Sequence, residues 1–250
     1  MSANELNDRL SRISTLWTLI FEAHQEGPAE AVGLAQRRLI ERYGGAVYGY
    51  LRGAVREEEA ADDLFQEFAL RFLRGDFRNA NPERGRFRDF VKTAVFHLII
   101  DHHKRRKQQP AHMGAGHEPA AAPGPDSPES EQMFLSAWRD ELMNLTWLAL
   151  ERFERESGQP YHTMLRHRSD NPLLSSGELA DQVGNRLGKQ YSIDAVRQVL
   201  HRAREKFAQL LLNEVEQSIE RVSRDRVEQE LIDLGLLTYC RRALDLRFGR

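Results

Sequence analysis

Apolar residues recur at intervals of three and four along almost the whole chain, and no stretch alternates apolar with polar residues for long enough to indicate a strand. The first periodic run extends from Leu6 to Ile20. It follows the N-cap candidates Ser2 and Asn4 and stops at Gly27-Pro28. The spacing therefore predicts an all-α protein.

Further helices are predicted from the same spacing up to the middle of the chain. Their approximate bounds are 28–44, ended by the pair Gly44-Gly45, then 46–55, 58–74 and 87–107. In the helix over 58–74, the residues Phe65, Phe68 and Phe72 share a stripe with other apolar side chains, while the acidic residues lie on other faces. We expect this stripe in a core.

A segment rich in Pro, Ala and Gly divides the chain. Residues 108–130 contain five prolines and few large apolar residues, a composition that cannot build a core. We expect two helical domains joined by this flexible linker. The first covers residues 1–107 and has its main core over about 28–107; the second covers 131–213 and is followed by a helical extension over 214–250.

Charge changes this picture because it is clustered rather than uniform. The chain has 36 Lys and Arg against 38 Asp and Glu, a formal net charge of −2. Attraction to nucleic acid would therefore have to come from local surfaces. Residues 83–107 hold eight basic and three acidic residues, whereas residues 56–67 hold six acidic residues and one Arg. A cationic helix thus follows an acidic one.

A second cationic helix follows a Gly-containing turn in the second half of the chain. Ser176 can cap one helix and Ser192 the next. The side chains expected to face inward on the second helix are Ile193, Val196, Leu200 and Ala203. Those expected to face outward are Asp194, Arg197, Gln198, His201, Arg202 and Arg204. This pattern is typical of a helix-turn-helix, whose second helix enters the major groove of DNA. From charge alone, an amphipathic helix with a solvated cationic face is an equal alternative.

Three strings in a fixed order carry a family resemblance. "VRQVLHRAREKF" (Val196–Phe207) resembles the recognition helix of region 4 of bacterial extracytoplasmic-function (ECF) sigma factors. "YLRGAVREEEAADDLFQEFALRFL" (Tyr50–Leu73) and "GRFRDFVKTAVFHLIIDHHKRRK" (Gly85–Lys107) are similar to region 2 of the same family. The resemblance spans about Tyr43–Lys107 and Ser175–Leu212. It implies a region 2-like helical bundle and a region 4-like helix-turn-helix.

The resemblance implies a sigma factor that binds core RNA polymerase and directs promoter recognition, strand opening and transcription initiation. The residues implied to dock on the basic clamp helices of the polymerase are Asp62, Asp63, Gln66 and Glu67. The residues implied to read the minus-35 duplex are Ser192, Asp194, Arg197, Gln198, His201, Arg202 and Arg204. An ordinary solvated face is the alternative interpretation of the acidic residues.

The segment from residue 75 to residue 107 is implied to open and hold the minus-10 element, with cations on phosphates and aromatic or amide groups on bases. The residues in question are Phe77, Asn79, Asn81, Arg84, Arg86, Arg88, Lys92, His97, Arg105 and Arg106. His97 stands where the family has Asn. Arg105 and Arg106 are expected to grip upstream duplex, and part of this basic cluster also complements the dipole at the end of its helix.

The second half departs from the family pattern in two places. The connection within the helix-turn-helix is longer, by about two residues if Gly188 is the turn glycine and by about six if Gly184 is. The segment "RESGQPYHTMLRHRSDNPLLSS" (residues 155–176) stands in place of the family's usual preceding motif. We therefore expect docking in the minus-35 groove to differ from the family pattern.

Other chemistries find little support in the residues. Five histidines fall within residues 97–117, but no cysteine joins them and two lie in the linker, so we expect neither a metal site nor a cofactor. We find no phosphate-binding glycine loop and no nucleophile motif, and we expect no enzyme. The lone Cys240 and the absence of a long apolar run lead us to expect a cytoplasmic protein without a membrane partner.

The partners implied are core RNA polymerase, promoter DNA and, as a further possibility, an anti-sigma factor. Two other classes stay open. A helix-turn-helix transcriptional regulator would act without polymerase docking and would need a dimer to match palindromic sites. A polymerase-binding regulator would keep the acidic helix without promoter selectivity.

Overall fold

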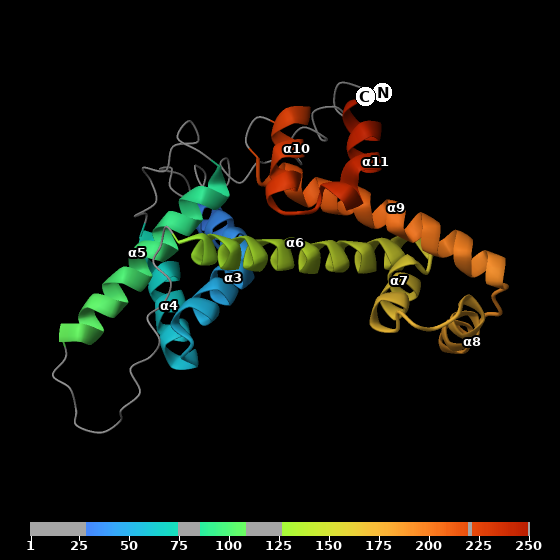
Figure 1. Cartoon of the computed structure of the whole chain (residues 1–250), viewed down its shortest axis with the longest axis horizontal. Helices are drawn as coiled ribbons and strands as arrows, with labels where there is room; N and C mark the ends of the chain where they lie inside the picture. Colours follow the sequence, from blue (N-terminus) through green and yellow to red (C-terminus); the bar gives the residue numbers. More distant parts are fainter. Residues whose placement is uncertain (1–28, 75–85, 109–126, 220–221, 250) are drawn as a thin grey trace. The chain divides into compact units, whose positions relative to one another are not determined.

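The computed structural model describes residues 29–74, 86–108, 127–219 and 222–249, so the predicted helix before residue 28 lies outside the described residues. Within them the chain forms nine α-helices and no strand (Figure 1), which confirms the all-α fold class. None of these helices combines the length and apolar character that crossing a membrane would need. Contacts group the chain into two compact units, Met1–Glu141 with Glu216–Val222, and Leu142–Val215 with Ser223–Arg250.

In the first unit, a single long helix, α3 (Ala29–Val55), replaces the two helices predicted before and after Gly44-Gly45. The glycines allow neighbours to approach closely instead of ending the helix. A Cβ atom at Gly44 would lie 3.1 Å from the ring of Phe65, and one at Gly45 would overlap the carboxylate of Glu141. The predicted break is therefore wrong, because packing outweighs the low helix propensity of glycine.

Helices α4 (Glu58–Arg74) and α5 (Phe87–Gln108) have the bounds expected from the sequence, within one residue. Phe68 and Phe72 of α4 are buried, as are Val91, Val95 and Leu98 of α5. Phe65 is only half-buried and packs edge-on against Tyr48 of α3. These stripes hold α4 and α5 together, so the position of the charged faces of both helices is fixed by an apolar core.

The start of α6 (Pro128–Ser157) completes the core of the first unit. Trp138, 1% exposed, stacks on Tyr43 of α3 with ring centroids 4.9 Å apart, and Phe134 lies 5.3 Å from Tyr50. The Tyr50 hydroxyl is also 2.6 Å from the hydroxyl of Ser130. The compact units accordingly divide within α6, at Glu141–Leu142, whereas the sequence places the start of the second domain at residue 131. Aromatic side chains beyond the proline-rich segment account for the difference.

The second unit contains a three-helix core that includes α7 (Tyr161–Asp170), α8 (Ser176–Leu187) and α9 (Ile193–Gln217). Met164 of α7 is fully buried against Leu179 and Val183 of α8 and Leu200 of α9. Helix α7 falls in the segment that matches no family pattern, and its ten residues with one buried side chain, Met164, leave little periodic signal in the sequence. It packs against α8 and α9 and completes the hydrophobic core of the helix-turn-helix.

Local signals position α8 and α9. Ser175, rather than the predicted Ser176, caps α8: its hydroxyl accepts from the Glu178 backbone, and the Glu178 carboxylate accepts from the Ser175 backbone. Gly188 ends α8 with a left-handed φ of 62°. The Ser192 hydroxyl then accepts from the Ala195 backbone at 3.1 Å, so Ser192 caps α9 as predicted. The turn glycine is therefore Gly188.

The C-terminal extension forms α10 (Arg224–Asp233) and α11 (Leu237–Phe248), and both belong to the second unit. Cys240 of α11 is fully buried, and its Sγ lies 4.0 Å from the Ala208 carbonyl of α9. Burial raises the pKa of this thiol to about 12. Arg224 of α10 bridges to Asp245 of α11 at 2.7 Å. The extension thus packs along α9 through buried side chains.

Candidate functional site

Helix α4 presents an acidic face to solvent. Asp62, Asp63 and Gln66 are exposed, while Glu67 is half-buried. Tyr48 of α3 hydrogen-bonds to Asp62, and this bond together with burial raises the pKa of the tyrosine. Asp63 forms no ion pair with any described residue. The four residues predicted for polymerase docking therefore share one helix, but only three of them are open to solvent.

The basic end of α5 folds back onto acidic residues around α4. Arg105 Nη2 lies 3.0 Å from Glu67 Oε2, and Arg71 Nη2 lies 2.5 Å from the other Glu67 oxygen. Arg106 donates to both carboxylate oxygens of Glu57 at 2.9 Å. The sequence did not point to Glu57 as a partner, because it precedes α4 and lies 49 residues from Arg106. Acidic and basic residues assigned to different partners thus bind each other.

Glu67 titrates below its ordinary range as a result. Burial alone would raise its pKa, but hydrogen bonds from Arg105 and Arg71, together with their positive charge, outweigh burial and lower the pKa below 4.5. The Glu67 carboxylate is therefore ionised at neutral pH. It holds two guanidinium groups, one from its own helix and one from α5.

Of the residues predicted for the minus-10 element, some lie outside the described residues and others are partly or fully buried. Phe77, Asn79, Asn81 and Arg84 lie outside the described residues. Arg88 is 4% exposed, because it lies on the same stripe of α5 as buried Val91 and Val95, and this guanidinium does not face solvent. Lys92 is half-buried in an ion pair with Glu131 of α6, and Arg86 is half-buried near Asp89. The sequence expected all three cations on phosphates.

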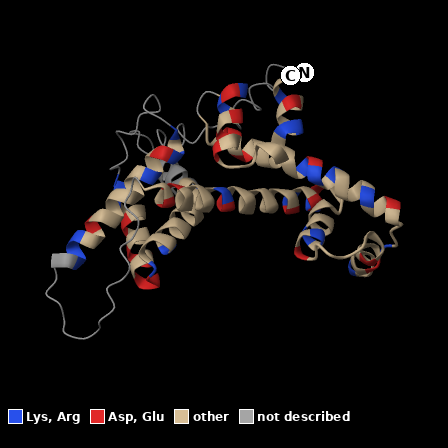
Figure 2. Ribbon diagram, in the orientation of Figure 1, with Lys and Arg blue, Asp and Glu red and all other residues tan. Residues whose placement is uncertain are grey.

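His97, Arg105 and Arg106 are the members of that set exposed within the described residues. Arg105 and Arg106 keep 57% and 46% of their side-chain surface exposed despite their ion pairs. Figure 2 shows basic residues gathered toward the C-terminal end of α5. This end is thus a cationic surface among the described residues of the first unit.

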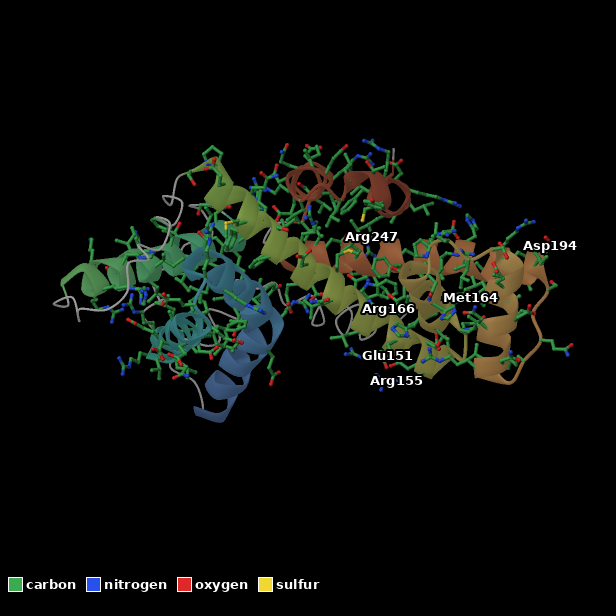
Figure 3. All side chains as sticks on the ribbon, turned by 60° about the horizontal axis from the view of Figure 1, so that its bottom comes forward. Glu151, Arg155, Met164, Arg166, Asp194 and Arg247 are labelled. Atoms are coloured by element: carbon green, nitrogen blue, oxygen red, sulfur yellow. The ribbon has the colours of Figure 1, made fainter. Side chains whose placement is uncertain are left out.

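The outward face of α9 carries the residues predicted for the minus-35 element. All seven of these side chains, those of Ser192, Asp194, Arg197, Gln198, His201, Arg202 and Arg204, are exposed. Figure 2 shows Lys and Arg recurring along this helix, and Figure 3 labels Asp194 near its N-terminal end. Val196, Leu200 and Ala203 face inward as predicted, but Ile193 is 48% exposed, since it starts the helix beyond the three-helix core.

Two charged residues on this face of α9 have partners within the helix itself. Arg197 lies 3.4 Å from Asp194, and His201 Nε2 lies 3.4 Å from Glu205, in both cases within one turn of the same helix. Arg202 and Arg204 form no ion pair with any described residue. The face can therefore offer cations and hydrogen-bonding groups to an anionic partner without breaking contacts to another helix. Such a surface suits the grooves and phosphates of duplex DNA.

Comparisons with known proteins bear on the first unit. Residues 39–109 match the family model for Sigma-70 region 2, and this segment runs from within α3 through α4 and α5. No curated protein and no solved structure matches the chain. The match supports a sigma-factor role in polymerase binding and promoter recognition. Residues 39–109 of this chain are thus similar to Sigma-70 region 2, and within them α4 carries the acidic face and α5 the basic end.

Proposed function

We propose that this protein is a sigma factor of the ECF type, which binds core RNA polymerase and directs it to promoters. The observation that carries the proposal is the Sigma-70 region 2 match over residues 39–109 on a unit whose α4 exposes acidic side chains. A capped helix-turn-helix in the same chain supports it. The protein acts by binding, and the polymerase supplies the chemistry.

Docking on polymerase is assigned to the exposed acids of α4. Asp62 and Asp63 point away from the buried stripe that includes Leu64 and Phe68, so a partner can reach them without unfolding the unit. A basic partner surface would gain association rate and a fixed register from these charges. Glu67 contributes in a different way, because it holds Arg105 and Arg71 in place.

Promoter contacts are assigned to two surfaces. The basic end of α5, with Arg105 and Arg106, contacts DNA near the minus-10 element, and the outward face of α9 contacts the minus-35 duplex. Arg197 and Gln198 lie near the N-terminal end of α9, which in a helix-turn-helix meets base edges. Arg202 and Arg204 lie later in the helix and suit phosphates.

Transcription in vitro tests the proposal. Purified core polymerase and the full-length protein are incubated with fragmented genomic DNA, and the transcripts are sequenced. We expect initiation at a limited set of sites sharing two elements, and co-purification of the protein with core. Absence of both results would favour the alternative, a helix-turn-helix regulator that acts without core polymerase. The observation behind this alternative is the hydrophobic core that α7, α8 and α9 form together.

Charge reversal locates the docking surface. Asp62→Lys with Asp63→Lys should weaken core binding by about tenfold or more, because like charges brought together in an interface cost several kcal/mol. Glu129→Lys with Asp140→Lys is the matched control, since it makes the same charge change on exposed residues of α6. Equal core affinity of the two double variants would contradict the docking assignment.

A further inference from the structure

The C-terminal extension contacts α9 beside its outward face through the carboxylate of Glu205. Glu205 Oε1 lies 2.5 Å from Arg242 Nη1 of α11 and 3.4 Å from His201 Nε2 of α9. The guanidinium of Arg242 and the imidazole of His201 therefore converge on one oxygen. Since His201 belongs to the face assigned to DNA, Arg242 lies beside that face although it comes from another helix.

Arg242 changes the net charge around Glu205. Glu205 is an acid at the edge of a surface that is otherwise suited to phosphates, and an unbalanced carboxylate there would repel DNA. Arg242 offsets the charge of Glu205 and still keeps 69% of its side chain exposed. It can therefore neutralise the acid and donate to a second anion at the same time, since a guanidinium has five N–H donors.

Further donors lie next to Arg242 on α11. An open hollow of about 560 Å³ is lined by Thr238, Arg241, Arg242, Asp245 and Leu246. Asp245, the acid in this lining, is bound by Arg224 at 2.7 Å. Arg241 is 59% exposed and has Glu228 3.9 Å away. The hollow therefore presents a hydroxyl and two guanidinium groups that each have a carboxylate nearby but stay more than half exposed, so their remaining N–H donors can reach a phosphate oxygen.

We propose that α11 is part of the DNA-binding surface: Thr238, Arg241 and Arg242 bind a backbone phosphate of the duplex alongside the recognition helix α9. This inference rests on the proposed function in that it takes α9 as the DNA-reading helix. It gives the extension a positive role. The exposed side chains of His201, Arg202 and Arg204 are open to DNA with α11 in its place, so the extension does not cover them. Figure 3 labels Arg247, a further arginine of the same helix.

Salt dependence of DNA binding tests the proposal. The full-length protein is titrated against a fluorescent 30-base-pair duplex of arbitrary sequence over a series of salt concentrations. Arg241→Ala with Arg242→Ala should lower the affinity for every sequence alike. It should also reduce the slope of log affinity against log salt by about 0.9, which is the contribution of the one proposed phosphate contact. Arg226→Ala, which removes an exposed arginine of α10, is the matched control and should leave the slope unchanged.

A second comparison separates phosphate binding from simple neutralisation of Glu205. Glu205→Gln should raise the affinity, and Glu205→Gln with Arg242→Ala should still show a smaller slope than Glu205→Gln alone. Equal slopes of these two variants would overturn the phosphate contact. Thermal unfolding is recorded for each variant. Thr238→Glu, which keeps both arginines, should cause the same loss of affinity even if the alanine variants unfold.

The failures of the two proposals are distinguishable. Unchanged affinity and slope in the Arg241 and Arg242 double variant, with normal duplex binding by the wild type, would overturn the role of α11 alone. Wild-type protein that binds no duplex even at low salt would overturn the assignment of α9 as well. Core binding is measured separately and depends on α4, so neither result alters it.

Discussion

The basic end of α5 and the outward face of α9 carry similar residues but differ in what holds them. Arg105 and Arg106 bind acids from around a neighbouring helix, at 3.0 and 2.9 Å, whereas Arg202 and Arg204 form no ion pair with any described residue. A DNA phosphate must compete with Glu67 and Glu57 at α5 but meets no such competitor at Arg202 or Arg204. The comparison shows that the number of cations in a sequence does not measure the charge available to a partner.

The largest expected effect comes from the packing beneath α9. Leu200→Ala should lower the free energy of unfolding of the second unit by about 2–5 kcal/mol, because it leaves a cavity in the three-helix core. Ile193→Ala, in the same helix but 48% exposed, is the control and should cost far less. Chemical denaturation measures both. Leu200→Ala should abolish binding to the minus-35 element, while binding to core polymerase persists. Loss of polymerase binding as well would show that the outward face of α9 and the acidic face of α4 are not independent.

Alanine substitution compares the two cationic surfaces directly. Arg204→Ala should weaken binding to all duplexes alike and reduce the salt slope by about 0.9. Arg106→Ala should reduce the slope less, since Glu57 already offsets that charge. Fluorescence anisotropy over a salt series provides the measurement. A larger loss at Arg106 than at Arg204 would reverse the ranking of the two surfaces.

Base readout at α9 gives an effect confined to some sequences. Arg197→Ala or Gln198→Ala should change which minus-35 sequences bind, by about 1–3 kcal/mol at the base concerned. Arg204→Ala serves here as the control, because it should leave the preference unchanged. Selection from a randomised minus-35 library would reveal the shift. If all three variants selected the same minus-35 sequences, the N-terminal part of α9 would not take part in base readout.

Releasing an arginine at α5 should produce a smaller change of opposite sign. Glu57→Gln removes the partner of Arg106 and should raise affinity for duplex DNA, while costing less than about 1 kcal/mol of stability, as is usual for exposed ion pairs. Glu59→Gln is the control: this residue is an exposed acid in the first turn of α4. Equal affinities of the two variants would indicate that Glu57 does not compete with DNA.

The smallest expected effect is a pH dependence at Glu67. Its pKa is lower in the folded protein than in the unfolded chain, so its stabilising contribution is present above the ordinary value of 4.5 and is lost as pH falls through the lower folded value. Wild type should therefore be more stable than Glu67→Gln at neutral pH, and the difference should vanish in acid. Asp63→Asn, at an exposed residue that forms no ion pair with any described residue, should show no such dependence. Denaturant titrations at several pH values provide the test.

Sequence patterns predicted features that depend on neighbouring residues, and missed those that depend on distant ones. The bounds of α4 and α5 and the cap at Ser192 follow from local spacing and local hydrogen bonds. Helix α7 was missed because its single buried anchor, Met164, gives little periodicity. The pairing of Arg71 with Glu67 was accessible from their spacing of four residues, but that of Arg106 with Glu57 was not.

The sequence by itself determined an all-helical chain, the region 2 similarity, the acidic stretch before a basic helix, and the outward residues of α9. Each of these follows from local periodicity or from a local motif. Only the tertiary structure decided that α3 runs through Gly44-Gly45, that Arg88 is buried, that Glu57 and Glu67 bind the basic end of α5, and that Arg242 reaches Glu205. These outcomes depend on which surfaces of distant helices meet. Burial and long-range ion pairing select the contacts, and the spacing of residues along one helix does not specify them.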